Sequence, residues 1–518
     1  MSAHGAAYPP AGGKGPVFNV LDYGARNDGS AMATAAFRAA IAAAAKAGGG
    51  TVYVPAGNYV SGPIQMVSNL TLYIGAGATI RFPAMKLPFT PGRQQGIETP
   101  TPLPLIGGHN LENVAVEGRG TLISSNAAWM KLHPRIMPTA ANPGSANGMA
   151  WEKLLHILNA NGRPTRAEYL AAAAELRPSF IRFMNCKNVL IEGLRIMGSP
   201  MWTVHLLYTE NADVENMVIE TYPGVNTDGI VVDSSRFIRI ANDYIDTGDD
   251  GIVIKSGKGP DGRRVGRPSE DITITNCTVH HAHGAVTIGS EMSGDVRNLV
   301  ASNITAVDTE NGIRIKSRRG RGGVVEDVRF DNWTMRNVGT AIVVTDYYVM
   351  EGESPTQPQP VTVGTPILRN IAVSNVTIDG AKKLIDIYGL PEMPIKGLHV
   401  HNVMGSGQVG LRANFTDDLE LRNIQLEPAS GPAFQIQHST NLELDNLSTR
   451  KPLAGTPVIH LQSSPGAIVR NCRAFPGTGV FLSASPAELK TLLKSGNLLA
   501  NAREPFAAAP AAQSPVTR

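Results

Sequence analysis

The sequence contains few of the features that mark several common protein classes. Its 518 residues include only three cysteines, Cys186, Cys277 and Cys472. Their odd number and wide spacing argue against a disulfide framework or a zinc knuckle, so we expect buried thiols. No apolar run approaches the ~20 residues of a transmembrane helix. Aromatic residues make up only 6% of the chain and the net charge is only +3, which does not fit a nucleic-acid-binding protein.

Glycine and proline, in contrast, are abundant, with 54 and 36 residues. This composition favours short strands joined by many turns over long surface helices. The first 16 residues have no charged or apolar region of a signal peptide. Either the protein is cytoplasmic or a signal peptide is absent from this chain.

A strand pattern that ends in Asn repeats from about residue 110. Copies include Leu111–Gly118, Ile272–Asn276 and Leu419–Asn423, and successive copies lie mostly about 21 to 35 residues apart. Such a period is typical of a β solenoid. The closing Asn tolerates a left-handed turn, and its amide can bond to the copies above and below. We therefore predict an all-β fold, a parallel β-helix of roughly a dozen coils.

The β-helix is expected to form one catalytic domain over residues 17–500, with a disordered segment at 1–16 and a loose tail at 501–518. An Ala-rich helix over 31–47, stopped by three glycines, should cap its first coil. Long insertions at 81–108 and 126–180 break the period, as does a shorter one at 351–365. Insertions of this kind tend to lie on the binding face of a solenoid.

Four short signals occur at similar intervals within residues 226–316. Spacings of 22, 33 and 31 residues separate Asp228, Asp250, His283 and Arg314. If each interval is one coil, the signals lie one above another. The signals are Asn226-Thr227-Asp228, Gly248-Asp249-Asp250, His283-Gly284 and Arg314-Ile315-Lys316.

The three aspartates suit acid–base chemistry. Asp249 and Asp250 can face the same side only if the chain bends, which Gly248 and Gly251 permit. Clustered carboxylates repel one another, so the pKa of at least one should rise, and a glycosidase needs one protonated and one ionised carboxyl group. The alternative is that Asp-Asp-Gly is only a turn.

Arg314 and Lys316 share one face of a strand, which favours binding of an anionic group such as a sugar carboxylate. The alternative is that they pair with the aspartates. His281 and His283 also share a face, but without a second cluster of ligands we expect no metal site.

Together these residues resemble the polygalacturonases of glycoside hydrolase family 28, over about residues 17–450. Residues 22–25 and 50–52 also resemble the opening of pectin-degrading β-helices generally. The matching segments are Ser199–His205, Asn226–Gly229, Thr247–Asp250, Ile254–Gly257, His283-Gly284, Ile288–Glu291, Gly312–Lys316 and Tyr348.

The resemblance implies a right-handed β-helix that hydrolyses α-1,4-linked galacturonic acid with inversion and without a cofactor. It implies that Asp249 is the general acid, that Asp228 and Asp250 activate water, and that His283 tunes the acid. An inverting pair needs carboxyl groups about 6.5–9.5 Å apart, which one coil with a sideways offset could supply. Substrate binding is implied for four residues: Asn226, Arg314, Lys316 and Tyr348.

The sequence departs from the family pattern in three respects. Ala282 replaces the usual Gly before His283, three dispersed cysteines cannot form the disulfides of many fungal members, and both long insertions exceed those of simple endo-acting members. The insertions favour exo action, because long loops could block one end of a groove. Alternatives are xylogalacturonan, rhamnogalacturonan or an unsaturated oligogalacturonide as substrate, a pectate lyase, and a non-catalytic carbohydrate-binding β-helix. We expect a monomer that binds pectic substrate, not nucleic acid or membrane, and is secreted or periplasmic.

Overall fold

The computed structural model describes residues 15–133, 150, 153–154, 157, 165–173, 175–348 and 357–509. Our expectations for residues 1–14, 349–356 and 510–518 fall outside these ranges. The chain divides into two compact units. Unit 1 comprises Met1–His283 and Glu291–Val296, and unit 2 comprises Gly284–Ser290 and Arg297–Arg518.

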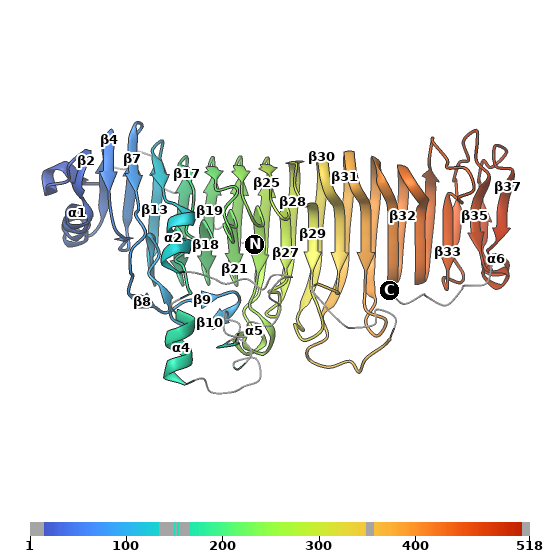
Figure 1. Ribbon diagram of the computed structural model, residues 1–518, viewed down its shortest axis with the longest axis horizontal. Helices are drawn as coiled ribbons and strands as arrows, with labels where there is room; N and C mark the ends of the chain where they lie inside the picture. The colour runs from blue at the N-terminus through green and yellow to red at the C-terminus, as the bar shows by residue number, and fades with distance from the viewer. Residues whose placement is uncertain are drawn as a thin grey trace. The chain divides into compact units, whose positions relative to one another are not determined.

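Unit 1 is a stack of coils, and most of its coils contribute one short strand to each of three parallel ladders (Figure 1). The ladder that leads to the aspartates contains β5 (Ile64–Gln65), β12 (Ile106–His109), β15 (Ile181–Met184), β18 (Val204–Leu207), β21 (Ile230–Asp233) and β24 (Ile252–Lys255). The second ladder contains β1 (Val17–Asn19), β3 (Gly50–Val54), β6 (Leu70–Ile74), β13 (Glu112–Gly118), β16 (Lys187–Glu192), β19 (Glu210–Glu215), β22 (Arg236–Ala241) and β25 (Ser269–Thr275). The third contains β2 (Asp28–Met32), β4 (Gly57–Val60), β7 (Ala78–Arg81), β14 (Thr121–Ile123), β17 (Arg195–Met197), β20 (Val218–Glu220), β23 (Tyr244–Asp246) and β26 (Thr278–His280).

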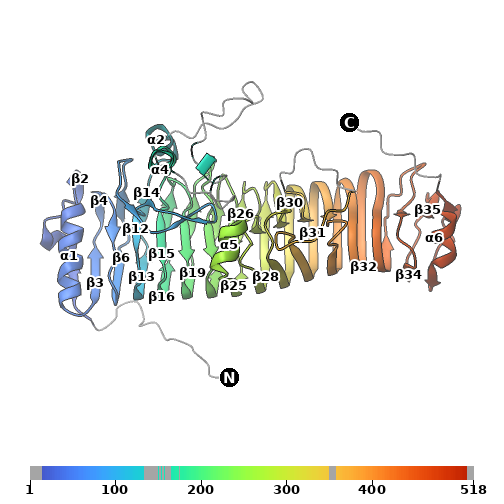
Figure 2. The ribbon, with the colours of Figure 1, turned by 90° about the horizontal axis from the view of Figure 1, so that it is seen from below.

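Unit 2 continues the same pattern with longer strands, and its helix α6 (Pro486–Thr491) lies at its last coils (Figure 2). Its strands are β27 (Val286–Gly289), β28 (Val296–Val307, whose first residue belongs to unit 1), β29 (Asn311–Lys316), β30 (Val324–Thr345), β31 (Ile367–Tyr388), β32 (Ile395–Ser448), β33 (Ile459–Gln462), β34 (Ile468–Arg470), β35 (Val480–Ala484), β36 (Leu493–Ser495) and β37 (Glu504–Ala508). Both units therefore have the parallel β-helix architecture that the repeat predicts.

The core of each coil is a column of apolar side chains that point inward. Alternation along each strand places every second residue inside, and parallel register puts like positions above one another. One buried column in unit 1 runs through Leu72, Val116, Ile191, Val214, Ile240 and Ile274. The three cysteines are buried free thiols, as predicted.

The Asn residues that close the copies form hydrogen-bonded ladders, which confirms the predicted scaffold role. Asn402 has φ 55°. Its Nδ2 donates to Asn375 Oδ1 at 2.9 Å, and its Oδ1 accepts from Asn423 Nδ2 at 2.8 Å. Each Asn therefore satisfies a left-handed turn and links two neighbouring coils.

Asn402→Ala is expected to destabilise unit 2 by about 2 kcal/mol, because it removes two ladder hydrogen bonds and leaves a Cβ-bearing residue without them in a left-handed turn. Asn402→Gly removes the same hydrogen bonds but accepts the backbone conformation, so it should cost about 1 kcal/mol. Urea unfolding midpoints of the two variants measure this difference. Equal midpoints would show that the left-handed conformation carries no cost here.

Helix α1 (Thr34–Lys46) packs on the first coils of unit 1 and caps them, as predicted (Figure 2). It buries Phe37 and Ile41 together with three alanines. Two details differ from our expectation. Residues 31–32 belong to β2, and the strand predicted at 17–23 ends at Asn19, because Val20–Tyr23 form the 3₁₀ helix η1.

The two long insertions of unit 1 carry their own elements. Residues 81–108 contain two small antiparallel pairs, β8 (Phe89–Thr90) with β11 (Thr101–Pro102) and β9 (Arg93–Gln94) with β10 (Ile97–Glu98). Helices α2 (Asn126–Leu132) and α4 (Arg166–Ala173) lie in the second insertion, and α5 (Gly259–Val265) follows β24. Figure 1 shows α4, α5, β9 and β10 gathered beside the ends of the unit 1 strands. Among the described residues, no helix is long and apolar enough to cross a membrane.

Candidate active site

Asp228 and Asp250 occupy equivalent positions on neighbouring coils of unit 1. Each lies two residues before its strand, β21 or β24, and these strands pair in register from Ile230 opposite Ile252. The backbone N–H of Gly229 donates to the carbonyl of Asp250 at 3.0 Å. The spacing of 22 residues is therefore one coil, as predicted.

The chain bends at Gly248–Asp250, just before β24, as the flanking glycines suggested. Gly248 is needed there because a Cβ would lie 2.1 Å from the carbonyl oxygen of Gly224 on the preceding coil. Buried threonines brace the bend: Thr221 Oγ1 donates to Thr247 Oγ1 at 3.0 Å, and Thr247 Oγ1 donates to the carbonyl of Thr227.

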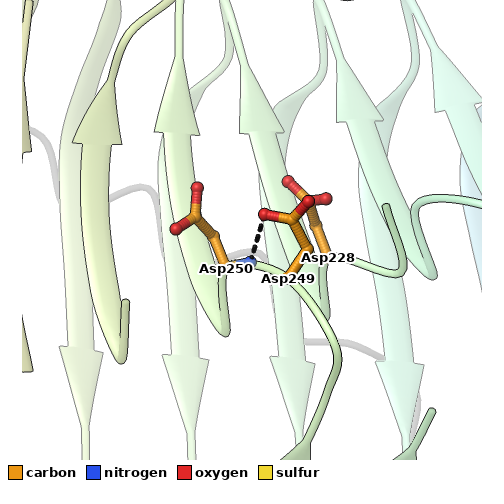
Figure 3. Close-up of side chains that lie close together, drawn as sticks. All are labelled: Asp228, Asp249 and Asp250. Atoms are coloured by element: carbon orange, nitrogen blue, oxygen red, sulfur yellow. Dashed lines mark hydrogen bonds between the residues drawn. The ribbon is translucent and has the colours of Figure 1, made fainter. Parts of the chain in front are cut away.

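The bend brings the carboxylates of Asp228, Asp249 and Asp250 to one side of the ribbon (Figure 3). One oxygen of each lies within 4.8 Å of the others. This closest approach is shorter than the carboxyl separation expected for an inverting pair, because all three side chains turn toward one another. The Asp249 side chain is 18% exposed and that of Asp228 only 3% exposed.

Asp249 is held by three contacts. Its Oδ1 accepts the backbone N–H of Asp250 at 2.8 Å and lies 3.3 Å from Nδ1 of His283. Its Oδ2 accepts from Nδ2 of Asn226 at 3.3 Å. The backbone N–H of His283 donates to the carbonyl of Asp249 at 3.0 Å, so His283 lies one coil beyond the aspartates. The structure thus brings together all the site residues predicted in unit 1.

Lys255 is a charged residue of the site that we did not single out from the sequence. Its side chain is 6% exposed, and its Nζ lies 3.7 Å from Asp228 Oδ2 and 3.1 Å from Glu291 Oε2. Burial alone would lower the pKa of Lys255, but the carboxylates of Glu291, Asp228, Asp250 and Asp249 outweigh burial and raise it. Lys255 is therefore a permanent cation beside the aspartates. Its place in the matched segment 254–257 is the signal that could have found it.

Trp202 and His205 pack beneath this cation. Lys255 Nζ lies 5.0 Å from the centroid of the Trp202 ring, a cation–π contact, and His205 meets the same ring edge-on at 4.9 Å. His205 Nε2 lies 3.7 Å from Asp233 Oδ2. Burial lowers the pKa of His205, so the imidazole is neutral near pH 7.

The first insertion is tied to this buried layer by Arg93. Its Nη1 donates to Asp233 Oδ1 at 2.7 Å and to Ser234 Oγ at 2.8 Å, with both charged side chains fully buried. Burial alone would raise the pKa of Asp233, but Arg93 outweighs it and lowers that pKa. Arg93 therefore fixes the insertion beside β21.

The second insertion reaches the turn that carries Asn226. Arg177 is buried, and it donates to Asn226 Oδ1 at 3.1 Å and to the carbonyl of Pro200 at 2.6 Å. Asn126, the first residue of α2, donates to the carbonyls of Ser199 at 3.1 Å and Val225 at 3.2 Å. Both long insertions thus contact the segments around the aspartates.

The predicted cationic residues lie in unit 2. Arg314 pairs with Thr287 and Lys316 with Gly289 along β27 and β29, so the coil repeat there is 27 residues. The spacing of 31 between His283 and Arg314 is therefore not one coil, and our expectation that all four signals share one position is wrong. Arg314 lies further along its strand because the loop before β29 is short.

Tyr348 gathers both cations in unit 2. The Arg314 guanidinium lies 5.6 Å and the Lys316 ammonium 5.1 Å from its ring centroid. The Tyr348 backbone N–H donates to the carbonyl of Ser317 at 3.0 Å. The three residues predicted to bind substrate in this unit are therefore in mutual reach.

The other histidines of the HHxH run have separate partners. His281 Nδ1 lies 2.9 Å from Asp246 Oδ1, and its ring stacks on Tyr222 at 4.3 Å. His280 packs against Tyr244 at 5.3 Å. Within the described residues, the only group of three His, Cys, Asp or Glu side chains close enough to hold an ion is the three aspartates.

Comparisons with known proteins agree with this site. The signature of glycosyl hydrolases family 28 matches residues 155–409, and that of rhamnogalacturonase A/epimerase, pectate lyase-like, matches residues 17–101. A hyperthermoactive exopolygalacturonase from Thermotoga maritima is 33% identical, with 80% of this chain and 92% of that chain covered at a TM-score of 0.69. A family 28 exopolygalacturonase from Yersinia enterocolitica is 22% identical, covers 88% of this chain and 78% of its own, and has a TM-score of 0.64, which supports the right-handed β-helix fold. A probable polygalacturonase from Vitis vinifera is 27% identical over 74% of this chain and 73% of its own length. The chain belongs to glycosyl hydrolases family 28.

Proposed function

We propose that this chain hydrolyses α-1,4-galacturonosidic bonds of polygalacturonate and oligogalacturonates, and that it does so from the chain end. The observation that supports this most directly is the cluster of Asp228, Asp249 and Asp250, with one oxygen of each within 4.8 Å. The relatives named as polygalacturonases and exopolygalacturonases support the substrate.

In the proposed reaction Asp249 protonates the leaving glycosidic oxygen, since its carboxyl group is the more accessible to a bulky sugar. Asp228 and Asp250 are almost fully buried, so they suit activation of a small nucleophile, water, on the opposite side. Water adds to the anomeric carbon as the glycosidic bond breaks, which inverts the configuration. His283 orients Asp249 through their contact of 3.3 Å.

Arg314, Lys316 and Tyr348 are proposed to bind a galacturonate unit. An Arg guanidinium can hold a carboxylate through two parallel hydrogen bonds, and Lys316 adds a second positive charge. The Tyr348 ring, which contacts both cations, offers an apolar face to the sugar. Asn226, which donates to Asp249, is proposed to contact substrate from the other unit.

The exo mode is supported by the way the insertions are anchored. Arg93 and Arg177, one from each insertion, are buried and hydrogen-bonded to the segments that carry the site. Loops fixed in this way can act as a wall that stops a long chain from passing through.

Product analysis during digestion of polygalacturonate tests substrate, reaction and mode together. We expect reducing ends to accumulate as short products from the earliest times while viscosity falls slowly. A steep early loss of viscosity would contradict exo action. A UV-absorbing double bond in the products, or loss of activity with a chelator, would instead indicate a Ca²⁺-dependent lyase.

Rhamnogalacturonan is the second candidate substrate, because residues 17–101 match a rhamnogalacturonase-type signature. Release of reducing ends from rhamnogalacturonan faster than from polygalacturonate would favour it. Because a pectic polymer does not cross a membrane, we further propose that the protein acts as a secreted or periplasmic monomer. Cell fractionation and light scattering test these two points.

Glu392→Gln is expected to raise KM for oligogalacturonates by about fivefold or more while kcat changes little. Glu392 accepts from Arg319 Nε at 2.6 Å and from Nη2 at 2.8 Å, and the Arg319 guanidinium lies 5.6 Å from the ring of Tyr347, the neighbour of Tyr348. Loss of this buried pair should loosen the tyrosine that contacts substrate. Glu326→Gln, which breaks the exposed pair with Arg369, is the matched control and should leave KM unchanged. An equal effect of both changes would contradict the role of Glu392.

A further inference from the structure

Unit 2 contains an open groove whose lining includes none of the site residues named above. Its volume is about 1110 Å³, and it crosses six successive coils between Asp308 and Leu453. Five steps of about 4.8 Å give a length of about 24 Å, which accommodates several linked sugars. A groove of this size exceeds the usual volume of a small-ligand pocket.

The floor of the groove is made of residues too small to fill it. Gly339 and Gly407 lie where a Cβ would come within 2.4 Å of the Glu310 carbonyl oxygen and 2.6 Å of the Ala381 carbonyl oxygen. Ala381 and Ala429 line the same floor. The turns therefore stack closely, and backbone rather than side chains faces the hollow.

Long polar side chains line the groove, and its cations lie in the later coils. Lys382 is exposed and has no ion pair among the described residues. The Lys451 side chain is 81% exposed, with only a contact of 3.3 Å to Glu427. The carboxylate of Asp308, in the first coil, accepts from Asn337 at 2.6 Å. The later coils thus present more free positive than negative charge.

We propose that this groove binds an acidic polysaccharide chain, as a second contact for the polymer that the carboxylate cluster cleaves. This inference rests on the proposed function, and it adds a binding site remote in sequence from the aspartates. The chain carboxylates pair with Lys382 and Lys451, while sugar hydroxyls bond to the exposed backbone and to Gln408. A second attachment raises the affinity for long chains and leaves short ones unaffected, because only a long chain reaches both places.

The test uses the full chain with Asp249→Asn, so that substrate is bound and not cleaved. Dissociation constants for long polygalacturonate chains and for the galacturonate trimer are measured by calorimetry. Ala429→Trp fills the groove, and Lys382→Ser with Lys451→Ser removes its charge. We expect each change to weaken binding of long chains about fivefold or more, with trimer binding unchanged. Lys490→Ser, an exposed lysine on α6, is the control.

Unchanged binding of long chains, or an equal loss for the trimer, would overturn the groove site. Tight binding of an uncharged galactan would overturn its acidic ligand class. Turnover of the trimer by the protein with Asp249 intact separates this result from the proposed function. If the trimer is hydrolysed but the groove variants bind long chains normally, only the groove proposal fails. If the trimer is not hydrolysed but the groove variants lose long-chain binding, only the proposed function fails.

Discussion

Asp249→Asn is expected to lower kcat on polygalacturonate by about a thousandfold or more while the protein remains folded. The amide cannot donate a proton to the leaving oxygen, and its NH₂ group cannot accept both the Asn226 amide and the His283 ring as the carboxylate does. The side chain is partly exposed and nearly the same size, so packing should not change. Initial rates of reducing-end release, together with the melting temperature, measure the two effects.

Asp246→Asn is the matched control for this experiment. Asp246 lies three residues before Asp249 and pairs with His281 at 2.9 Å, much as Asp249 pairs with His283, but it is not part of the carboxylate cluster. We expect kcat to stay near the original value in this variant. If Asp246→Asn and Asp249→Asn lose activity equally, the assignment of the general acid to Asp249 is wrong.

Lys255→Met should destabilise unit 1 by about 3–5 kcal/mol, the cost of leaving buried charges without their partner. Lys255 lies 3.7 Å from Asp228 and 3.1 Å from Glu291, and its side chain is 6% exposed. Methionine has a similar length and can pack on the Trp202 ring, so the loss isolates the charge rather than the volume. Chemical unfolding followed by tryptophan fluorescence measures it.

The pH dependence of this loss has a defined sign. The carboxylates raise the pKa of Lys255 in the folded protein above its ordinary value of 10.5. The stability that Lys255 contributes is thus fully present below pH 10.5 and is lost only as pH rises through the folded pKa. The deficit of Lys255→Met should therefore be constant from about pH 6 to 9. Lys490→Met, an exposed change on α6, should cost almost nothing, and a similar cost for both would contradict the buried-charge argument.

The coil repeat was predictable because a solenoid stabilises itself between nearest neighbours. Each coil must place apolar residues inward and close its turn with an Asn, so the same pattern recurs in the chain. The ladder from Asn375 through Asn402 to Asn423 shows this rule in the structure. The spacing from Asp228 to Asp250 followed from the same repeat.

The contacts made by the insertions were not predictable in this way. Arg93 and Arg177 lie in aperiodic segments, so no repeat indicates that their guanidinium groups reach Asp233 and Asn226. Loop length also hid the register of Arg314, because the coil from Thr287 to Arg314 has 27 residues rather than 31.

The sequence by itself determined the β-helix and brought Asp228, Asp249 and Asp250 to one bend, since periodic strands and glycines act locally. The tertiary structure alone decided which charges surround them. Lys255 is an inconspicuous residue at the end of a strand until the fold buries it between Asp228 and Glu291, 36 residues further along the chain. Electrostatic partners depend on distance in space, and that distance is set by packing, not by spacing along the chain.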